Sequence, residues 1–244
     1  MNATAEQLRE AVERAKTVVF FGGAGVSTES GIPDFRSVDG LYNQKYDYPP
    51  ETILSDTFFY THTEGFFKFY RERMLFPDAQ PNPAHKKLFE LEQAGKLRGI
   101  VTQNIDGLHR KAGNKLVYEL HGTVYENTCL ECGRKYGLDF ILNSTGIPRC
   151  ACGGVVKPDV VLYGESLDKY TIMGACREIS QADVLIVAGT SLTVQPAASF
   201  LDYFSGRDLV VINRDATSAD SRASLVLHEP VGKVLGAIEV RPAE

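Results

Sequence analysis

The hydrophobic positions of the chain follow two different periods, and these predict alternating helices and strands. Residues 5–16 have helical spacing, with one apolar stripe made of Leu8, Ala11, Val12 and Ala15. Residues 17–21 then form an unbroken β-branched and aromatic run. Such a run is typical of a central strand in a parallel sheet, because both of its faces are covered.

Later apolar runs repeat this alternation. Strands are predicted at residues 99–102, 116–120, 160–164, 183–191, 209–215 and 224–228, with helical patterns between them, one starting near Pro196. This rhythm predicts the α/β class with a doubly wound, mostly parallel sheet. Residues 37–95 contain no strong strand pattern, and their aromatic residues recur at helical spacing. We therefore interpret this segment as a helical insertion whose aromatic residues form core.

Charge and length exclude some classes of function. The chain has 244 residues and a formal net charge of -5, so it lacks the overall basic character that direct nucleic-acid binding needs. Its first sixteen residues are polar and amphipathic rather than a secretory signal, and no apolar run approaches the length of a membrane span. We expect a cytoplasmic protein with no direct nucleic-acid or membrane partner.

Two polar clusters follow two of the predicted strands. Gln103, Asn104, Ile105 and Asp106 come after the strand at 99–102, and His121 follows the next strand. In an open α/β sheet, ligands bind in the crevice beyond the carboxyl ends of the strands. Amide, carboxylate and imidazole groups therefore converge in one cleft, which is the candidate active site.

A glycine-rich turn, GGAGVST at residues 22–28, follows the first strand. A turn of small residues between a strand and a helix lets backbone N–H groups approach a phosphate. The third glycine of the dehydrogenase fingerprint would fall at Thr28, so that fingerprint is not met and a plain strand-to-helix turn remains an alternative. Arg36, just beyond the turn, is either a phosphate ligand or a solvated loop residue.

Four of the five cysteines form two close pairs. Cys129 and Cys132 are separated by seventeen residues from Cys150 and Cys152. This arrangement predicts a tetrahedral zinc site, and because four thiolates leave no open position, the zinc would be structural. The second pair is one residue closer than the usual spacing. Cys176 lies in a helical pattern, which favours a small buried thiol.

Several motifs in a fixed order carry a family resemblance. They are GAGVSTESGIPDFR, TQNIDGLH, HG, the two cysteine pairs, KPDVVLYGE, GTSLTVQPAA and INRD. From about Val18 to the C-terminus, the chain resembles the sirtuin family. The resemblance implies an NAD-dependent protein lysine deacylase that acts on acylated-lysine proteins or peptides. We expect it to be a monomer.

The same resemblance implies two domains. A Rossmann-like NAD-binding domain would comprise residues 1–36, 96–122 and 157–244. The small domain would combine a helical insertion with the cofactor loop at 37–95 and a zinc ribbon at 123–156, with one structural Zn²⁺ held by Cys129, Cys132, Cys150 and Cys152.

Individual residues also acquire implied roles. Those expected to bind NAD are Ala24, Thr28, Phe35, Arg36, Gln103, Ile105, Asp106, Thr190, Ser191, Asn213, Arg214 and Val231. Ile105 and Asp106 would bind the nicotinamide carboxamide. The members from Thr190 onward would line the adenosine half.

Asn104 and His121 are the expected catalytic residues. Asn104 would hold a ribose hydroxyl and an ordered water, and His121 would act as the general base, because imidazole changes its charge near neutral pH. Without the surrounding motifs, a histidine at a strand end would instead be interpreted as an ordinary hydrogen-bonding residue.

Substrate recognition is expected at two places. A peptide would add as a strand between residues 160–163, which begin with Val160 and Val161, and residues 193–195; such pairing gives affinity with little demand on sequence. Tyr70 and Arg73 lie three residues apart on one helix, similar to the pattern in sirtuins that remove succinyl and malonyl groups. The alternative is a solvated arginine beside a core tyrosine.

Two other functions remain open at this stage. A protein ADP-ribosyltransferase would use the same cleft with a different acceptor. A non-catalytic NAD sensor or zinc-ribbon binding module would not need His121, Asn104 and Asp106 together.

Overall fold

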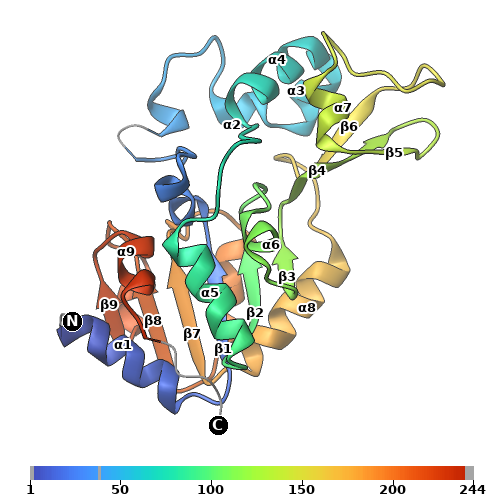
Figure 1. The fold of residues 1–244 in the computed structure, drawn as a ribbon. Helices are drawn as coiled ribbons and strands as arrows, with labels where there is room; N and C mark the ends of the chain where they lie inside the picture. The colour runs from blue at the N-terminus through green and yellow to red at the C-terminus, as the bar shows by residue number, and fades with distance from the viewer. Residues whose placement is uncertain (1–2, 38–39, 240–244) are drawn as a thin grey trace.

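The computed structural model describes residues 3–37 and 40–239, which form two lobes (Figure 1). The large lobe is built on a six-stranded sheet, and the small lobe lies beyond one end of those strands. No helix within the described ranges is both long and apolar enough to cross a bilayer.

Every strand pairing recorded in the large sheet is parallel. Its strands, in the order β3-β2-β1-β7-β8-β9, are β3 (Val117–Glu119), β2 (Leu97–Thr102), β1 (Val18–Gly22), β7 (Val184–Ala188), β8 (Asp208–Ile212) and β9 (Leu225–Leu227). The strand order reverses direction beside β1. That reversal is where doubly wound sheets leave a crevice for ligands, and the predicted fold class is confirmed.

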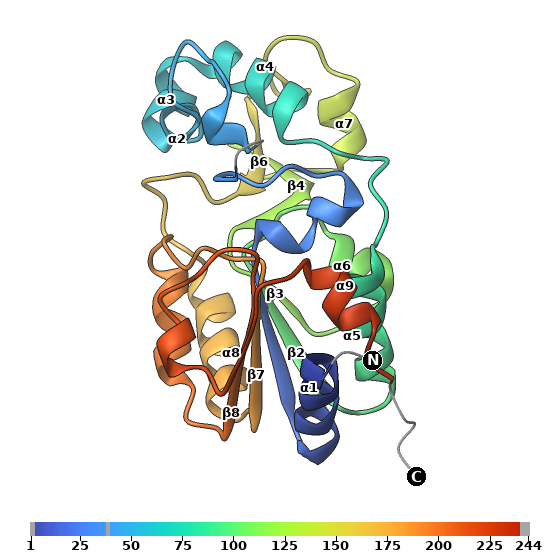
Figure 2. The same cartoon turned by 90° about the vertical axis from the view of Figure 1, so that its left-hand side faces the viewer.

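Helices cover both faces of this sheet (Figure 2). One face carries α1 (Ala3–Arg14), α5 (Pro83–Gln93), α6 (Leu108–Ala112) and α9 (Val231–Gly236), and the other carries α8 (Lys169–Ser180) and the 3-10 helix η4 (Ala197–Tyr203). Alternate residues of β1 serve the two faces: Val18 and Phe20 pack toward α1 and α5, whereas Val19 and Phe21 pack toward α8. Because both faces of β1 are buried, its apolar residues follow one another without interruption.

The small lobe combines helices with a three-stranded antiparallel sheet of order β5-β4-β6. Its elements are α2 (Pro50–Ile53), α3 (Asp56–Thr61), α4 (Thr63–Arg73), β4 (Gly122–Cys129), β5 (Lys135–Tyr136), α7 (Leu138–Leu142) and β6 (Val156–Val160). Buried rings of Phe59, Phe66, Phe67 and Tyr70 lie in its core. The insertion therefore has the aromatic core that its helical spacing predicts.

One predicted strand is wrong. Residues 160–164 do not form a strand of the large sheet, because the strand is β6, four residues earlier, where alternate side chains are buried against the small lobe. The helix expected from about Pro196 is present as η4, of the 3-10 type. The remaining short 3-10 segments are η1 (Ala24–Val26), η2 (Thr28–Ser30), η3 (Leu41–Asn43) and η5 (Asp220–Arg222).

The packing also bears on the domain boundaries. Helix α5 lies within the range expected for the insertion, yet Ala84, Leu88 and Leu91 are buried in the core of the large lobe. Conversely, β6 extends the small lobe to Val160. We propose that the insertion ends before residue 83 and that the small lobe resumes at β4 and ends with β6.

Candidate active site

A cavity of about 390 Å³ runs between the lobes, at the carboxyl ends of the large-sheet strands. Such a volume lies in the range of sites that bury a small molecule. The structure brings together along this cavity all the residues proposed from the sequence for cofactor, substrate and catalysis: Ala24, Thr28, Phe35, Arg36, Tyr70, Arg73, Gln103, Asn104, Ile105, Asp106, His121, Val160, Val161, Thr190, Ser191, Asn213, Arg214 and Val231.

The glycine turn after β1 lies directly against the turn after β7. The Gly25 N–H donates to the Gly189 carbonyl at 2.8 Å. A Cβ on Gly25 would lie 2.8 Å from the Gly189 Cα, so a larger residue would force the two turns apart. The absence of side chains here is therefore a packing requirement that also leaves backbone groups accessible to a ligand.

A buried hydrogen-bond network joins this turn to the cluster after β2. The Asn104 Nδ2 group donates to Ser27 Oγ at 3.1 Å, and Ser27 Oγ donates to Asp106 Oδ2 at 2.6 Å. Burial raises the pKa of the Asp106 carboxyl, while hydrogen bonds from Ser27 and from the Leu108 N–H oppose that rise. The network fixes the amide and the carboxylate in one orientation at the cavity wall.

Ser27 is the site residue that sequence reasoning missed. It is buried within the glycine turn and borders the cavity between Asn104 and Asp106. Its position inside GAGVS was the available signal, because a hydroxyl in such a turn can both donate and accept.

His121 is held in one tautomer by the backbone. Its Nδ1 lies 2.9 Å from the Gln103 carbonyl, and because a carbonyl only accepts, Nδ1 carries the proton. Nε2 is therefore the nitrogen with a lone pair to accept another proton. Burial lowers the pKa of the imidazole, so the neutral form predominates near neutral pH.

The backbone at Gly122, directly after this histidine, leaves room only for a glycine. It has a φ of 73° and pairs with Val160, and a Cβ there would lie 2.0 Å from the Asp159 carbonyl oxygen. Next to it, the Val161 N–H donates to the His121 carbonyl at 2.9 Å. The chain thus passes from the large lobe into β4 at the histidine itself.

Phe35 and Arg36 lie on the loop that leads into η3. The Phe35 ring packs edge-on against Tyr42 at 5.6 Å, and the Arg36 guanidinium lies over the same ring at 5.2 Å. The Tyr42 hydroxyl contacts the Tyr163 hydroxyl at 2.7 Å. This loop is therefore anchored to the segment that follows β6.

At the other end of the cavity, side chains follow β7 and β8. Gln103 Nε2 donates to Thr190 Oγ1 at 3.1 Å, which joins the turns after β2 and β7. Ser191 and Arg214 are exposed, and Asn213 is half-buried with its amide donating to the Asp215 carbonyl. Val231, at the start of α9, provides an apolar wall.

Tyr70 and Arg73 line the same cavity from α4, but their exposure differs. Tyr70 is fully buried, and its hydroxyl has no hydrogen-bond partner among the described residues. Burial raises the pKa of this phenol, so it stays protonated and can donate. Arg73 is exposed, with its guanidinium 5.8 Å from the centre of the Tyr46 ring.

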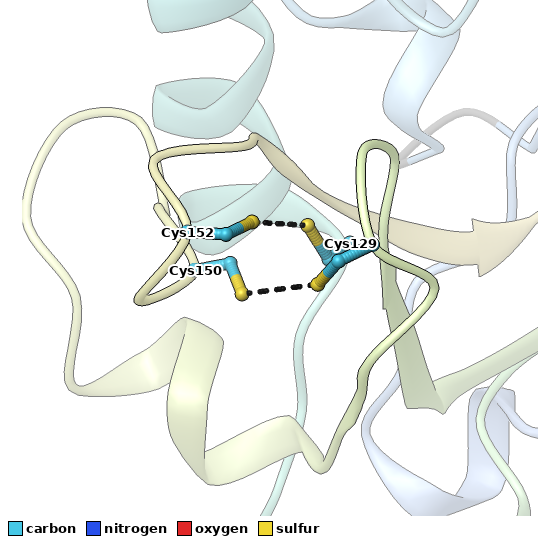
Figure 3. A group of neighbouring side chains, drawn as sticks. Cys129, Cys150 and Cys152 are labelled. Carbon is cyan, nitrogen blue, oxygen red and sulfur yellow. Dashed lines mark hydrogen bonds between the residues drawn. The ribbon is translucent and has the colours of Figure 1, made fainter.

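The four cysteines meet at the edge of the small lobe (Figure 3). Their sulfurs all lie within 4.8 Å of one another, with Cys129–Cys152 and Cys132–Cys150 each at 3.5 Å. A tetrahedral zinc with Zn–S bonds of about 2.3 Å requires sulfurs about 3.8 Å apart, so this donor set fits zinc. A hydrogen bond from the Cys152 backbone, assisted by the Tyr136 hydroxyl, lowers the pKa of Cys150 to about 6. Cys176 lies apart on α8, only partly buried.

Fold, cysteine cluster and histidine cleft together are those of a sirtuin-like enzyme. The chain belongs to the Sir2 family, whose family model matches residues 23–196. It is 55% identical over 236 residues to the NAD-dependent protein deacetylase of Clostridium acetobutylicum, covering 95% of this chain and 96% of that protein. It is 52% identical over 242 residues to the enzyme of the same name from Clostridium perfringens, covering 98% and 99%.

Solved structures agree with this assignment. A Sir2 structure with a p53 peptide and NAD⁺ is similar with a TM-score of 0.84 and 38% identity, covering 94% of this chain and 95% of that chain. A Sir2 variant with a deacetylated p53 peptide and 3'-O-acetyl-ADP-ribose is similar with a TM-score of 0.88 and 37% identity, covering 95% and 96%.

Proposed function

We propose that this protein is an NAD-dependent protein lysine deacetylase that releases nicotinamide and an O-acetyl-ADP-ribose. The observation that carries the proposal is the orientation of His121, whose Nδ1 is committed to the Gln103 carbonyl while the ring borders the cavity. The names of the relatives and the ligands of the similar solved structures support the same conclusion.

The roles of the chain's own groups follow from their chemistry. Asp106 and the main chain at Ile105 would hold the nicotinamide carboxamide, and Asn104 would hold a ribose hydroxyl. As the bond between nicotinamide and the ribose carbon breaks, the acyl-lysine oxygen would bond to that carbon. His121 Nε2 would then accept a proton from a ribose hydroxyl, which would attack the acyl carbon; a positioned general base contributes about 10² to 10⁴-fold. One water would be consumed as the lysine amine leaves and the acyl group stays on the ribose.

The backbone after β6 would receive the substrate peptide, but not through every group. The Val161 N–H pairs with His121, and the N–H and C=O of Tyr163 pair with Leu54 and Asp56. Since neighbouring residues of a strand present their groups to opposite edges, we propose that the peptide pairs at Leu162 and Gly164. There the Leu162 N–H donates to the Glu165 carboxylate, which a peptide carbonyl would replace, and the Leu162 carbonyl accepts from the Glu165 N–H.

The assay that tests the function combines NAD with acetyl-lysine peptide and identifies the products by mass spectrometry. Nicotinamide, free lysine peptide and O-acetyl-ADP-ribose in equal amounts are expected. ADP-ribosylated protein without O-acetyl-ADP-ribose would instead identify a transferase. NAD binding without any turnover of acetyl peptide would identify a sensor.

We further propose that the enzyme removes succinyl and malonyl groups as well as acetyl groups. The Tyr70 phenol, buried without a partner among the described residues, supports this, because a buried donor gains most from an acceptor such as a carboxylate. Arg73 borders the same cavity and supplies a positive charge. A charge-assisted hydrogen bond contributes about 1.5 to 3 kcal/mol, or roughly 10- to 150-fold in rate.

The matched variants are Arg73→Met and Arg71→Met. Arg73→Met is expected to lower kcat/KM for succinyl-lysine peptide selectively, leaving acetyl-lysine peptide within about twofold. Arg71, two residues away, donates instead to the Ile141 and Gly146 carbonyls, so its loss should affect both substrates alike. Equal loss of both activities in Arg73→Met, or a wild type inert toward succinyl-lysine, would refute the wider selectivity.

A further inference from the structure

We infer that Glu29 is a positioning residue that joins the two ends of the cofactor cleft. Glu29 lies in η2, immediately after Thr28, and its carboxylate reaches α9 at the far end of the chain. The Gly232 N–H donates to Glu29 Oε2 at 2.6 Å, across a separation of 203 residues. Figure 2 shows α9 beside the blue segment that follows β1. The inference rests on the proposed use of NAD.

The contact satisfies a group that α9 cannot satisfy itself. The first N–H groups of a helix have no partner within the helix. Pro230, at the N-cap of α9, provides no side-chain hydrogen bond. A carboxylate at a helix N-terminus is favourable because it both accepts from the free N–H and faces the positive end of the helix dipole.

Gly232 is fitted to this carboxylate. A Cβ at Gly232 would lie 2.7 Å from Glu29 Oε2, and the three nearest atoms it would meet all belong to the Glu29 carboxylate. An alanine here would therefore displace the carboxylate, which is the nearest group that the new Cβ would meet. This makes the pair separable by substitution from either side.

The bond holds two walls of the proposed adenosine and phosphate subsites together. Thr28 precedes Glu29, Val231 precedes Gly232, and both neighbours border the cavity. Without the bond, the first turn of α9 and η2 lose their mutual anchor. The network of Asn104, Ser27 and Asp106 does not involve Glu29, so binding of NAD should weaken while the chemical step remains.

The test uses Glu29→Ala, Glu29→Gln, Gly232→Ala and the double variant Glu29→Ala with Gly232→Ala. We expect Glu29→Ala to raise KM for NAD and Kd for ADP-ribose by about 3- to 30-fold, with kcat within about twofold. Glu29→Gln keeps an acceptor and should recover part of the affinity. Gly232→Ala should resemble Glu29→Ala in the wild-type background and add little in the Glu29→Ala background.

The control is Glu10→Gln, an exposed glutamate on α1, which should leave both constants unchanged. ADP-ribose binding is measured by calorimetry, and the thermal stability of each variant is measured separately. Wild-type affinity in Glu29→Ala, with only a lower Tm, would overturn the inference and leave the proposed function standing. Additive effects of the two substitutions would also overturn it. A wild type that binds neither NAD nor ADP-ribose would overturn both. Should Glu29→Ala fail to fold, Glu29→Gln and Gly232→Ala carry the test.

Discussion

The two lobes are stabilised in different ways. The large lobe has a parallel sheet covered by helices on both faces, with two apolar cores separated by the sheet. The small lobe has a short antiparallel sheet, a single core rich in aromatic rings and four cysteines at its edge. The large lobe therefore has an extensive core of its own, whereas the small lobe gains a cross-link between distant segments only when its thiolates share an ion.

The candidate functional residues are also divided between the two lobes. The candidate base and the residues of the carboxamide site lie on turns that follow large-sheet strands. Tyr70 and Arg73, which we propose contact the acyl group, come from the small lobe. Damage to one lobe should therefore have a different effect from damage to the other.

Removal of the metal is expected to have the most different effects on the two lobes. Thiolate-bound zinc contributes on the order of 10 kcal/mol to the folding of small domains, so a chelator or Cys132→Ser should unfold the small lobe and abolish peptide turnover. The large lobe should keep its protection from amide hydrogen exchange. Cys176→Ser is the control and should retain both metal and activity. Folded, active protein that contains no zinc by metal analysis would contradict this expectation.

Loss of the candidate base, in contrast, is expected to lower activity without lowering stability. His121→Ala is expected to lower kcat by about 10² to 10⁴-fold, because proton transfer to the imidazole is lost, while the Tm stays close to that of the wild type. His62→Ala, at an exposed histidine that precedes α4, should leave kcat unchanged. Turnover in His121→Ala near the wild-type rate would mean that another group is the base.

A pair of buried histidines makes the large lobe sensitive to acid. His85 on α5 and His109 on α6 have ring centres 4.7 Å apart. Burial lowers the pKa of His85 from 6.5 to about 4, and it lowers the pKa of His109 as well. The unfolded chain therefore binds protons first as pH falls, so stability is complete above about pH 6.5 and is lost progressively toward pH 4.

For His85 the loss is about 3 kcal/mol over that range. Urea unfolding of wild type and His85→Gln at pH 7, 6 and 5 measures it, because the variant should lose less stability between pH 7 and 5. Parallel pH dependence in the two proteins would remove His85 from the explanation.

The smallest expected difference between the lobes is the stability cost of removing one helix cap from each. Asn82 caps α5 and also donates to the Val26 carbonyl at 2.8 Å, whereas Ser55 caps α3 and accepts from the Phe58 N–H at 3.2 Å. Asn82→Ala should cost about 1 to 3 kcal/mol, because the buried Val26 carbonyl within the glycine turn loses its partner. Ser55→Ala should cost about 1 kcal/mol. Equal costs from denaturant unfolding would show that the bond to Val26 adds nothing.

Elements with a strong period were predictable from the sequence. The run at residues 17–21 identified β1, and the helical stripe of Leu8, Ala11, Val12 and Ala15 is buried as expected. The convergence of Gln103, Asn104, Asp106 and His121 followed from their positions after two parallel strands. These inferences need only local patterns and the geometry of a doubly wound sheet.

Other features depend on partners that are distant in sequence. The apolar letters at 160–164 do not show that β6 pairs with β4, because strand position is set by which side chains meet the small-lobe core. The role of Ser27 depends on hydrogen bonds with Asn104 and Asp106, which are 77 and 79 residues away in the sequence. Helix α5 has an ordinary amphipathic pattern, which cannot indicate which lobe it covers.

The junction at His121 and Gly122 has a mechanical consequence. The main chain enters the small lobe at this point, and the Val161 N–H returns to the His121 carbonyl as the chain leaves it. The candidate base therefore lies where two of the chain's crossings between the lobes meet. In a rotation of the small lobe about this junction, displacement would grow with distance from the pivot, so the walls of the proposed acyl pocket would move far while the imidazole stayed almost in place.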